Sequence, residues 1–126
     1  VSLNRSDGLA IAEIKKRGYK QIIISTENCD IIKLRAKKLG IKCFIGIDDK
    51  LLALKEYLSS EMLEFTEIAY VGNDINDLEA MSHAEFRICP KDAANSIKEI
   101  SNILLESNGG KGVIREIFSL LIAKSQ

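Results

Sequence analysis

Four side chains that could supply oxygen ligands fall within five positions of this 126-residue chain: Asn73, Asp74, Asn76 and Asp77. They follow the apolar run at 68–71 and Gly72, a pattern typical of a buried strand that ends in a turn. In open α/β sheets, ligands bind at the carboxyl ends of the strands, and carboxylates there can hold Mg²⁺ together with substrate phosphate oxygens. Asp and Asn are also ordinary turn and N-cap residues. The stretch by itself therefore leaves a metal site and simple capping open.

Polar residues also follow two other apolar runs. Ser25, Thr26, Glu27 and Asn28 lead into a predicted helix N-terminus, which can bind phosphate through its free N–H groups. Lys50 stands in the first turn of another predicted helix, where the helix dipole disfavours a cation unless an anion is nearby. Capping or solvation explains each feature alone. Together, a hydroxyl, a lysine and carboxylates at one sheet edge suit phosphoryl transfer, which relies on positioning and charge neutralisation.

The elements that would position these residues alternate along the chain. Apolar runs predict strands at 21–25, 41–47, 68–71, 86–89 and 103–105. Amphipathic segments predict helices at 8–17, from 28 or 30 to 39, and at 50–58, 78–81, 92–100 and 113–124. Ser6–Asp7 is the predicted cap of the first helix, Gly40 the predicted end of the second, and Asp48–Asp49 the predicted cap of the third. Because parallel strands need crossover helices, this alternation predicts an α/β fold, a three-layer doubly wound (Rossmann-like) parallel sheet forming one domain over 1–126.

Composition excludes several classes of partner. With 18 basic and 18 acidic side chains, the chain has no general attraction for nucleic acid or anionic membranes. No apolar run approaches the roughly 20 residues of a membrane span. The three cysteines lack metal-ligand spacing, and the only histidine, His83, suits a surface or capping role. We therefore expect a cytoplasmic protein with neither nucleic acid nor membrane as a partner.

In this order, the motifs resemble the haloacid dehalogenase (HAD) superfamily of phosphatases, in particular its uncapped branch. That branch includes 3-deoxy-D-manno-octulosonate 8-phosphate phosphatase, nonulosonate 9-phosphate phosphatases and the phosphatase-like C-terminal domains of acylneuraminate cytidylyltransferases. IIS at 23–25 resembles the second motif, Lys50 the third, and VGNDIND at 71–77 the fourth. GGKGVIRE at 109–116 resembles a glycine-rich tail that approaches a neighbouring subunit's site in family tetramers.

The resemblance implies a Mg²⁺-dependent phosphomonoesterase acting on a phosphorylated 2-keto-3-deoxy sugar acid, and a homotetramer. The substrate would be octulosonate 8-phosphate or a nonulosonate (sialic acid) 9-phosphate. Glu27 favours the latter, because the nonulosonate branch carries an acid there and the octulosonate enzymes resemble Thr-Gly-Arg. The implied catalytic residues are Ser25 and Lys50, and the implied metal ligands are Asn73, Asp74 and Asp77. The implied substrate- and phosphate-binding residues are Ser25, Thr26, Glu27, Asn28, Lys50, Gly110, Lys111 and Arg115.

The chain departs from the family pattern at two places. Asn73 stands where the fourth motif usually has an aspartate, so its oxygen would bind Mg²⁺ without a charge. The sequence also contains no Asp-x-Asp, the first motif, which supplies the nucleophile from a central strand between those ending at Ser25 and Gly72. We therefore expect the nucleophile upstream of Val1 in a longer polypeptide, or another segment in that position, and no activity from these residues alone.

Two other functions remain as alternatives. A non-catalytic, HAD-like oligomerisation domain attached to an acylneuraminate cytidylyltransferase would account for Asn73 and for the missing first motif. A phosphoacceptor receiver domain uses a similar sheet with an acid, a hydroxyl and a lysine. The glycine-rich segment before the last helix disfavours the receiver domain.

Overall fold

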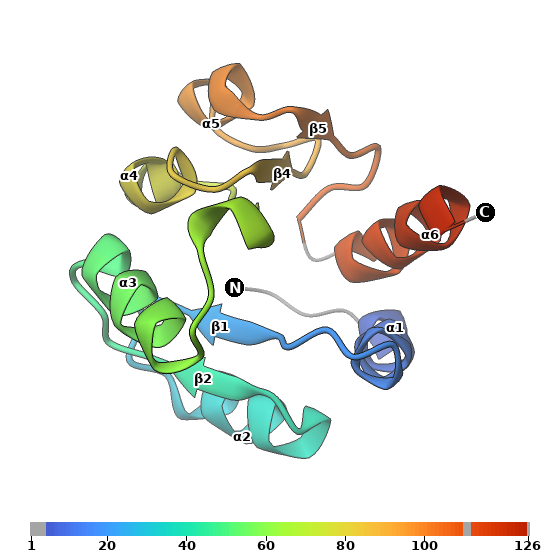
Figure 1. The fold of residues 1–126 in the computed structure, drawn as a ribbon, viewed down its shortest axis with the longest axis horizontal. Helices are drawn as coiled ribbons and strands as arrows, with labels where there is room; N and C mark the ends of the chain where they lie inside the picture. Colours follow the sequence, from blue (N-terminus) through green and yellow to red (C-terminus); the bar gives the residue numbers. More distant parts are fainter. Residues whose placement is uncertain (1–4, 110–111, 126) are drawn as a thin grey trace.

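Strands and helices alternate in the computed structural model, which describes residues 5–109 and 112–125 (Figure 1). The strands are β1 (Ile22–Ile24), β2 (Lys42–Phe44), β3 (Ala69–Val71), β4 (Phe86–Cys89) and β5 (Ile103–Leu104). The helices are α1 (Arg5–Lys16), α2 (Asp30–Leu39), α3 (Lys50–Ser60), α4 (Leu78–Met81), α5 (Asn95–Ile100) and α6 (Val113–Ser125). The 3₁₀ turns η1 (Phe65–Glu67) and η2 (Ile75–Asp77) precede β3 and α4. This order confirms the predicted α/β alternation.

The strands form two parallel sheets, β1–β2 and β3–β4–β5. Figure 1 shows β1 and β2 in the lower half of the molecule and β4 and β5 in the upper half. Within the described residues, β1 and β3 each pair on one side only and are not hydrogen-bonded to each other. The sheet is therefore interrupted between β1 and β3, where the resemblance to the HAD superfamily predicts a further strand.

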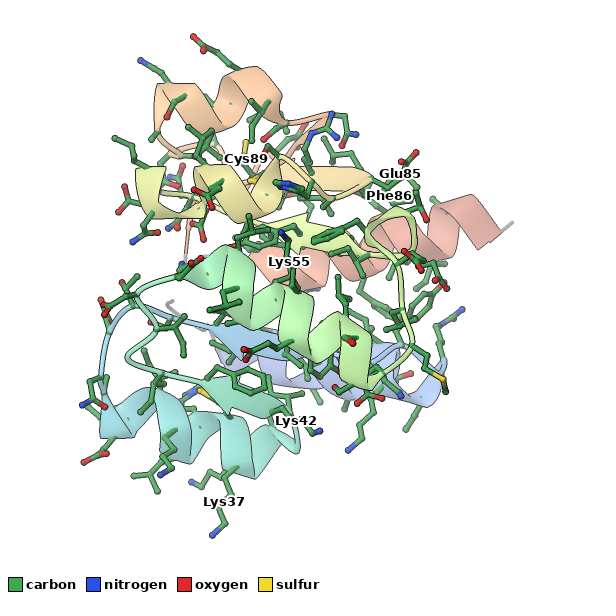
Figure 2. The ribbon with its side chains drawn as sticks, turned by 60° about the vertical axis from the view of Figure 1, so that its left-hand side comes forward. Lys37, Lys42, Lys55, Glu85, Phe86 and Cys89 are labelled. Carbon is green, nitrogen blue, oxygen red and sulfur yellow. The ribbon has the colours of Figure 1, made fainter. Side chains whose placement is uncertain are left out.

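Neighbouring strand residues point to opposite layers of helices. Ile23 packs with Ile32 and Ala36 of α2, whereas Ile24 packs with Leu54 of α3. In Figure 2, where Lys55 marks α3 and Lys37 marks α2, these two helices lie on either side of β2. This is the alternation that a strand covered on both faces requires.

The second sheet repeats the arrangement. Ile88 packs with Leu105 and with Val113 of α6, whereas the next residue, Cys89, packs with Met81 of α4. Helix α1 lies beside α6 (Figure 1). Helices α1, α2 and α6 thus cover one face and α3, α4 and α5 the other, which confirms the three-layer architecture. None of the helices in the described ranges is both long and apolar enough to cross a membrane.

Local chemistry sets the helix ends in two cases as predicted. Gly40 ends α2 in the left-handed region, with φ 71°, where its N–H reaches the carbonyls of Ala36 and Lys37. Asp49 caps α3 by accepting a hydrogen bond from Leu52 N at 3.0 Å. The predicted cap at Ser6–Asp7 is wrong, because α1 already begins at Arg5 and Asp7 lies in its first turn.

Two strand predictions need correction. The strand predicted at 41–47 ends at Phe44, because Gly46 N and Ile47 N turn to the loop after β1 and donate to the carbonyls of Glu27 and Ser25. The strand predicted at 68–71 is not buried. Its Val71 is 40% exposed, because β3 lies beside the interruption, where no other described strand covers it.

Candidate functional site

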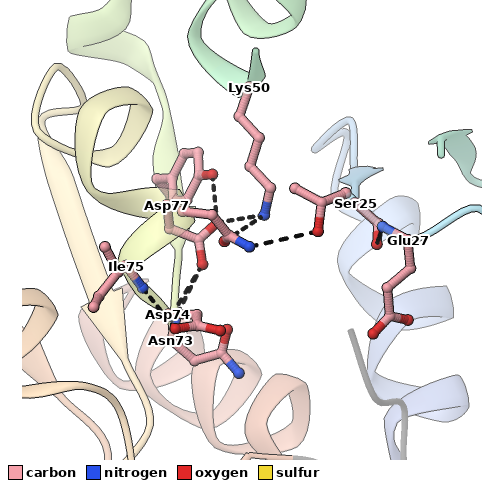
Figure 3. A network of polar contacts seen from close by, with 10 residues as sticks. Ser25, Glu27, Lys50, Asn73, Asp74, Ile75 and Asp77 are labelled. Atoms are coloured by element: carbon pink, nitrogen blue, oxygen red, sulfur yellow. Dashed lines mark hydrogen bonds and ion pairs between the residues drawn. The ribbon is translucent and has the colours of Figure 1, made fainter. Parts of the chain in front are cut away.

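The site centres on an ion pair between two buried side chains. Lys50 is the first residue of α3, and Asp77 ends η2, 27 residues further along. The Lys50 Nζ lies 2.7 Å from Asp77 Oδ1 (Figure 3). Both side chains are less than 10% exposed, and buried charges of this kind persist only when they are paired.

Both carboxylate oxygens of Asp77 are occupied by donors. Oδ1 accepts from Lys50 Nζ and, at 2.8 Å, from the Tyr70 hydroxyl. Oδ2 accepts from the backbone N–H groups of Asn73 at 3.1 Å and Asp74 at 3.2 Å. Burial raises the pKa of Asp77, but these donors, Lys50 foremost, outweigh it and hold the pKa below its usual value. Asp77 is therefore an ionised carboxylate with four hydrogen bonds from protein donors.

The turn between β3 and α4 depends on a close approach at Gly72. A Cβ on Gly72 would lie 2.7 Å from Met81 Sδ and 3.0 Å from Asp77 Cβ. Asp74 then caps η2 by accepting from Ile75 N with Oδ1 at 2.8 Å. Glycine is thus needed because Asp77 folds back against the backbone, and the turn leaves Asp74 exposed at the strand end.

The loop after β1 reaches the same place. Ser25 is buried, and its hydroxyl oxygen accepts from Glu27 N at 3.1 Å. Asn76 links this loop to the ion pair: its Oδ1 accepts from Lys50 Nζ at 3.3 Å, and its Nδ2 donates to Thr26 Oγ1 at 3.5 Å (Figure 3). The ends of β1 and β3 therefore meet at Lys50, although the two strands belong to separate sheets.

A third segment borders the turn on its other side. Asp92 Oδ1 accepts from Gly109 N at 2.8 Å, and Ala94 N donates to the carbonyl of Asn73 at 2.9 Å. A Cβ on Gly109 would lie 3.9 Å from Asn73 Nδ2. The glycine-rich segment therefore begins beside the acidic turn. The next two residues of that segment, Gly110 and Lys111, lie outside the described residues.

Not every predicted site residue joins this cluster. Glu27 and Asn28 are exposed, and Glu27 extends away from Lys50 in Figure 3. Arg115 lies exposed in the first turn of α6, where its backbone N–H donates to Asp7. No hydrogen bond or ion pair among the described residues joins these three side chains to Lys50 or Asp77, and their substrate-binding roles stay predictions.

Two members of the network were not assigned from the sequence. Tyr70 reads as one more apolar residue of the strand, and Asn76 reads as one more turn residue. Two signals in the sequence could have indicated these residues. Asn76 is adjacent to Asp77, and Tyr70 is the only hydroxyl-bearing residue of β3. Burial and the neighbouring Asp77 raise the pKa of Tyr70, so its hydroxyl keeps its proton and acts as a donor.

The hydrogen-bond donors that the cluster leaves for a ligand suit a phosphate group. Within the described residues, Lys50 Nζ donates to two acceptors, which leaves its third N–H for a ligand oxygen. The Ser25 hydroxyl accepts one hydrogen bond and donates none to an acceptor in the described part of the chain, so its proton can be donated to a ligand. A lysine and a hydroxyl at the ends of parallel strands can bind and neutralise phosphate oxygens.

Oxygen ligands for a cation are fewer. Asp77 is one of the three predicted metal ligands, but both of its oxygens accept hydrogen bonds from protein donors, and its role as a metal ligand stays a prediction. The exposed Asp74 carboxylate caps η2, and the adjacent, exposed Asn73 adds an amide oxygen. The described ranges hold no group of three or more His, Cys, Asp and Glu side chains arranged for a metal. One carboxylate and one amide fit Mg²⁺, which keeps several waters and binds through one or two carboxylates plus phosphate oxygens.

Three similarities to known proteins cover nearly all of the chain. N-acylneuraminate cytidylyltransferase A of Danio rerio is 30% identical over the whole chain, which spans 31% of that protein. The 3-deoxy-D-manno-octulosonate 8-phosphate phosphatase of Yersinia pestis is 26% identical over 96% of the chain and 65% of its own length. The chain thus spans less than two thirds of either relative.

A solved structure shows that a similar protein has the same fold. The 3-deoxy-D-manno-octulosonate 8-phosphate phosphatase of Moraxella catarrhalis, in complex with magnesium ion, phosphate ion and a KDO molecule, superposes with a TM-score of 0.89. It is 30% identical and covers 99% of this chain and 78% of its own. The family profile of haloacid dehalogenase-like hydrolases matches residues 46–117, from the loop after β2 into α6. Since this match includes more than half of the chain, the chain belongs to the haloacid dehalogenase-like hydrolases.

Proposed function

We propose that the cluster around Lys50 and Asp77 forms the phosphate- and metal-binding part of a Mg²⁺-dependent phosphomonoesterase. The observation that carries the proposal is the buried Lys50–Asp77 pair beside Ser25 and Asp74, at the carboxyl ends of β1 and β3. The pair keeps one ammonium N–H for a ligand, at a sheet edge where phosphate binding is common. The similarity to a phosphatase whose structure contains magnesium and phosphate supports this assignment.

Each residue has a distinct role in this proposal. Lys50 and Ser25 bind the phosphoryl oxygens, and Lys50 neutralises the charge that builds up during transfer. Asp74 and Asn73 hold Mg²⁺, which when bound polarises the phosphoryl group. Asp77 orients Lys50 and, through its bonds to Asn73 N and Asp74 N, shapes the turn that presents the metal ligands.

The attacking group is proposed to be an aspartate on a strand between β1 and β3. Both strands have an unpaired edge within the described residues, and unpaired backbone groups are costly when buried. A strand in this position would end between Ser25 and Asp74, within reach of a phosphate held by Lys50. Attack of the carboxylate on phosphorus would form an acyl phosphate while the P–O ester bond breaks and the substrate's alcohol leaves. Water would then hydrolyse the acyl phosphate to inorganic phosphate and the free carboxylate.

For the substrate we infer a phosphorylated 2-keto-3-deoxy sugar acid. The similarities to an octulosonate 8-phosphate phosphatase and to an N-acylneuraminate cytidylyltransferase support this class. The acid at Glu27 favours a nonulosonate 9-phosphate over octulosonate 8-phosphate. A homotetramer is part of the same proposal and is tested by a solution mass measurement.

A second candidate is a non-catalytic domain that assembles subunits of an acylneuraminate cytidylyltransferase. Asn73 favours this candidate, because the amide provides no charge where the fourth motif usually has a carboxylate. The 30% identity to the Danio rerio cytidylyltransferase over the whole chain favours it as well. The buried Lys50–Asp77 pair would then be retained for stability.

Phosphate release distinguishes the two candidates. The native polypeptide that contains these residues is incubated with octulosonate 8-phosphate and with a nonulosonate 9-phosphate, each with Mg²⁺ or with EDTA. Mg²⁺-dependent release that is lost in Lys50→Ala supports the enzyme. Absence of release from either substrate, with the fold intact by circular dichroism, supports the non-catalytic domain. Turnover that survives Lys50→Ala would contradict the role of Lys50.

A further inference from the structure

Tyr70 joins the apolar packing of the fold to the ion pair. Its ring is half-buried and packs against two clusters, one around Met81 and Ile97 and the other around Leu54 and Leu58. Its hydroxyl donates to Asp77 Oδ1 at 2.8 Å. A phenylalanine would supply the same ring to both clusters, so the packing does not account for the hydroxyl.

The hydroxyl fixes the one oxygen of Asp77 that the backbone does not hold. Oδ2 is fixed by the N–H groups of Asn73 and Asp74, whose positions are set by the turn. Oδ1 is shared between Tyr70 and the end of the long, rotatable Lys50 side chain. Without Tyr70, Oδ1 would be bonded only to the rotatable Lys50 side chain. The carboxylate could then rotate about its Cβ–Cγ bond, and the ammonium would follow that rotation.

We propose that Tyr70 is a positioning residue, whose hydroxyl holds the Asp77 carboxylate so that Lys50 keeps its third N–H directed at a phosphate oxygen. The phosphate part rests on the proposed function, whereas the effect on Lys50 does not. The raised pKa of Tyr70 is consistent with a permanent donor. Small displacements of a positioned group lower binding and rate strongly, which is the reason to hold Lys50 from two sides.

Nuclear magnetic resonance of the Lys50 ammonium tests the positioning directly. The chain is labelled with ¹⁵N-lysine, and the signal is assigned by its loss in Lys50→Arg. In Tyr70→Phe, we expect the signal to shift and broaden, because the ammonium loses its single orientation. The matched control is Tyr57→Phe on α3, since the Tyr57 hydroxyl has no hydrogen-bond partner among the described residues and its ring packs near Phe44. The control should leave the Lys50 signal unchanged.

Binding of inorganic phosphate in the presence of Mg²⁺, measured by calorimetry, gives the second readout. We expect affinity to fall roughly 10-fold in Tyr70→Phe and to stay unchanged in Tyr57→Phe. An unchanged Lys50 signal in folded Tyr70→Phe, or an equal loss of affinity in both variants, would overturn the proposal. If the unsubstituted chain binds no phosphate, the proposed function fails, and the Lys50 signal still decides the role of Tyr70.

A measurement on the unsubstituted chain covers the case in which Tyr70→Phe does not fold. The Tyr70 hydroxyl proton is expected to exchange slowly with solvent and to show a nuclear Overhauser effect to the Lys50 ammonium. Fast exchange, with no such contact in a chain folded by its amide spectrum, would overturn the proposal.

Discussion

The Lys50 ammonium and the Asp77 carboxylate lie 2.7 Å apart, and both are buried, although 27 residues separate them. Removing two charges from water costs several kcal/mol per ion, which the pair recovers only if its remaining hydrogen-bonding groups are also satisfied. Asp77 meets this condition through Tyr70 and two backbone N–H groups. Removing only one partner of this pair would leave an unpaired buried charge.

Removing either partner of this pair should destabilise the chain, and the two losses should not be additive. Lys50→Met leaves a buried carboxylate and Asp77→Asn leaves a buried ammonium, so each should lower the free energy of unfolding by about 3 kcal/mol. The double variant should lose less than the sum, because it leaves no unpaired charge. Urea unfolding at pH 7 measures all three. Additive losses would contradict the coupling.

An exposed pair provides the control. Lys20 and Glu61 lie 2.6 Å apart, slightly closer than Lys50 and Asp77, but the Lys20 side chain is 60% exposed. Because solvent screens exposed charges, Lys20→Met should leave the unfolding curve unchanged. A loss as large as that of Lys50→Met would show that distance, rather than burial, sets the strength of these pairs.

Acid should remove the stabilisation that Asp77 provides. Its pKa in the folded state is held below the unfolded value of about 3.9, so the ionised carboxylate stabilises the fold above that pH. The stabilisation is lost as the pH falls through the folded pKa. The difference in unfolding free energy between the unsubstituted chain and Asp77→Asn should therefore be largest near pH 7 and shrink below about pH 4. A difference that stays constant down to pH 2.5 would contradict this assignment.

Two glycine-to-alanine substitutions should change the stability of the chain in opposite directions. In Gly72→Ala, the added methyl would lie 2.7 Å from Met81 Sδ, and overpacking of this kind costs about 1–3 kcal/mol. In Gly8→Ala, within α1, the methyl would lie 3.5 Å from Leu39 Cδ2, an ordinary contact. Alanine should therefore stabilise that helix by about 0.5–1 kcal/mol. Thermal unfolding of both variants measures the two signs, and a stable Gly72→Ala chain would contradict the close approach.

Asp7 should contribute more to the stability of the chain than a local helix cap does. It is 1% exposed, and its Oδ1 accepts from Ile114 N at 3.1 Å and Arg115 N at 3.3 Å, so α1 caps α6 across 107 residues. Asp7→Ala should cost about 2 kcal/mol and increase amide hydrogen exchange at Ile114 and Arg115. The comparison is Asp49→Ala, which removes the exposed local cap of α3 at a cost of about 1 kcal/mol. An equal or smaller loss for Asp7→Ala would contradict the tertiary cap.

A carboxylate at position 73 should strengthen the proposed metal site. Asn73→Asp adds a charge beside Asp74 and should tighten Mg²⁺ binding by roughly 10-fold, because ligand charge count sets affinity for hard cations. Calorimetric titration with MgCl₂ measures this. The control Asn28→Asp adds the same charge at an exposed position after β1 and should have no such effect. Equal changes in the two variants would show a general charge effect instead of a site at residue 73.

Several features of this protein could be predicted from the sequence because they depend on a few neighbouring residues. The alternation of apolar runs and amphipathic segments predicted the parallel α/β fold, and Gly40 and Asp49 predicted a helix end and a helix start. Polar residues after two strands predicted that Ser25 and Lys50 lie near the acidic turn. These residues could be predicted to lie close together because the carboxyl ends of parallel strands meet at one edge of a sheet.

Only the tertiary structure decided which atoms meet. Asp7 reads as a local cap of α1 but caps α6, and Tyr70 reads as an apolar strand residue but donates to Asp77. Strand β3 reads as buried but is exposed beside the interruption in the sheet. The physical reason is distance along the chain. A run of residues determines its own periodicity and caps, whereas the partner of a buried hydroxyl or carboxylate depends on how the crossover helices bring remote segments together.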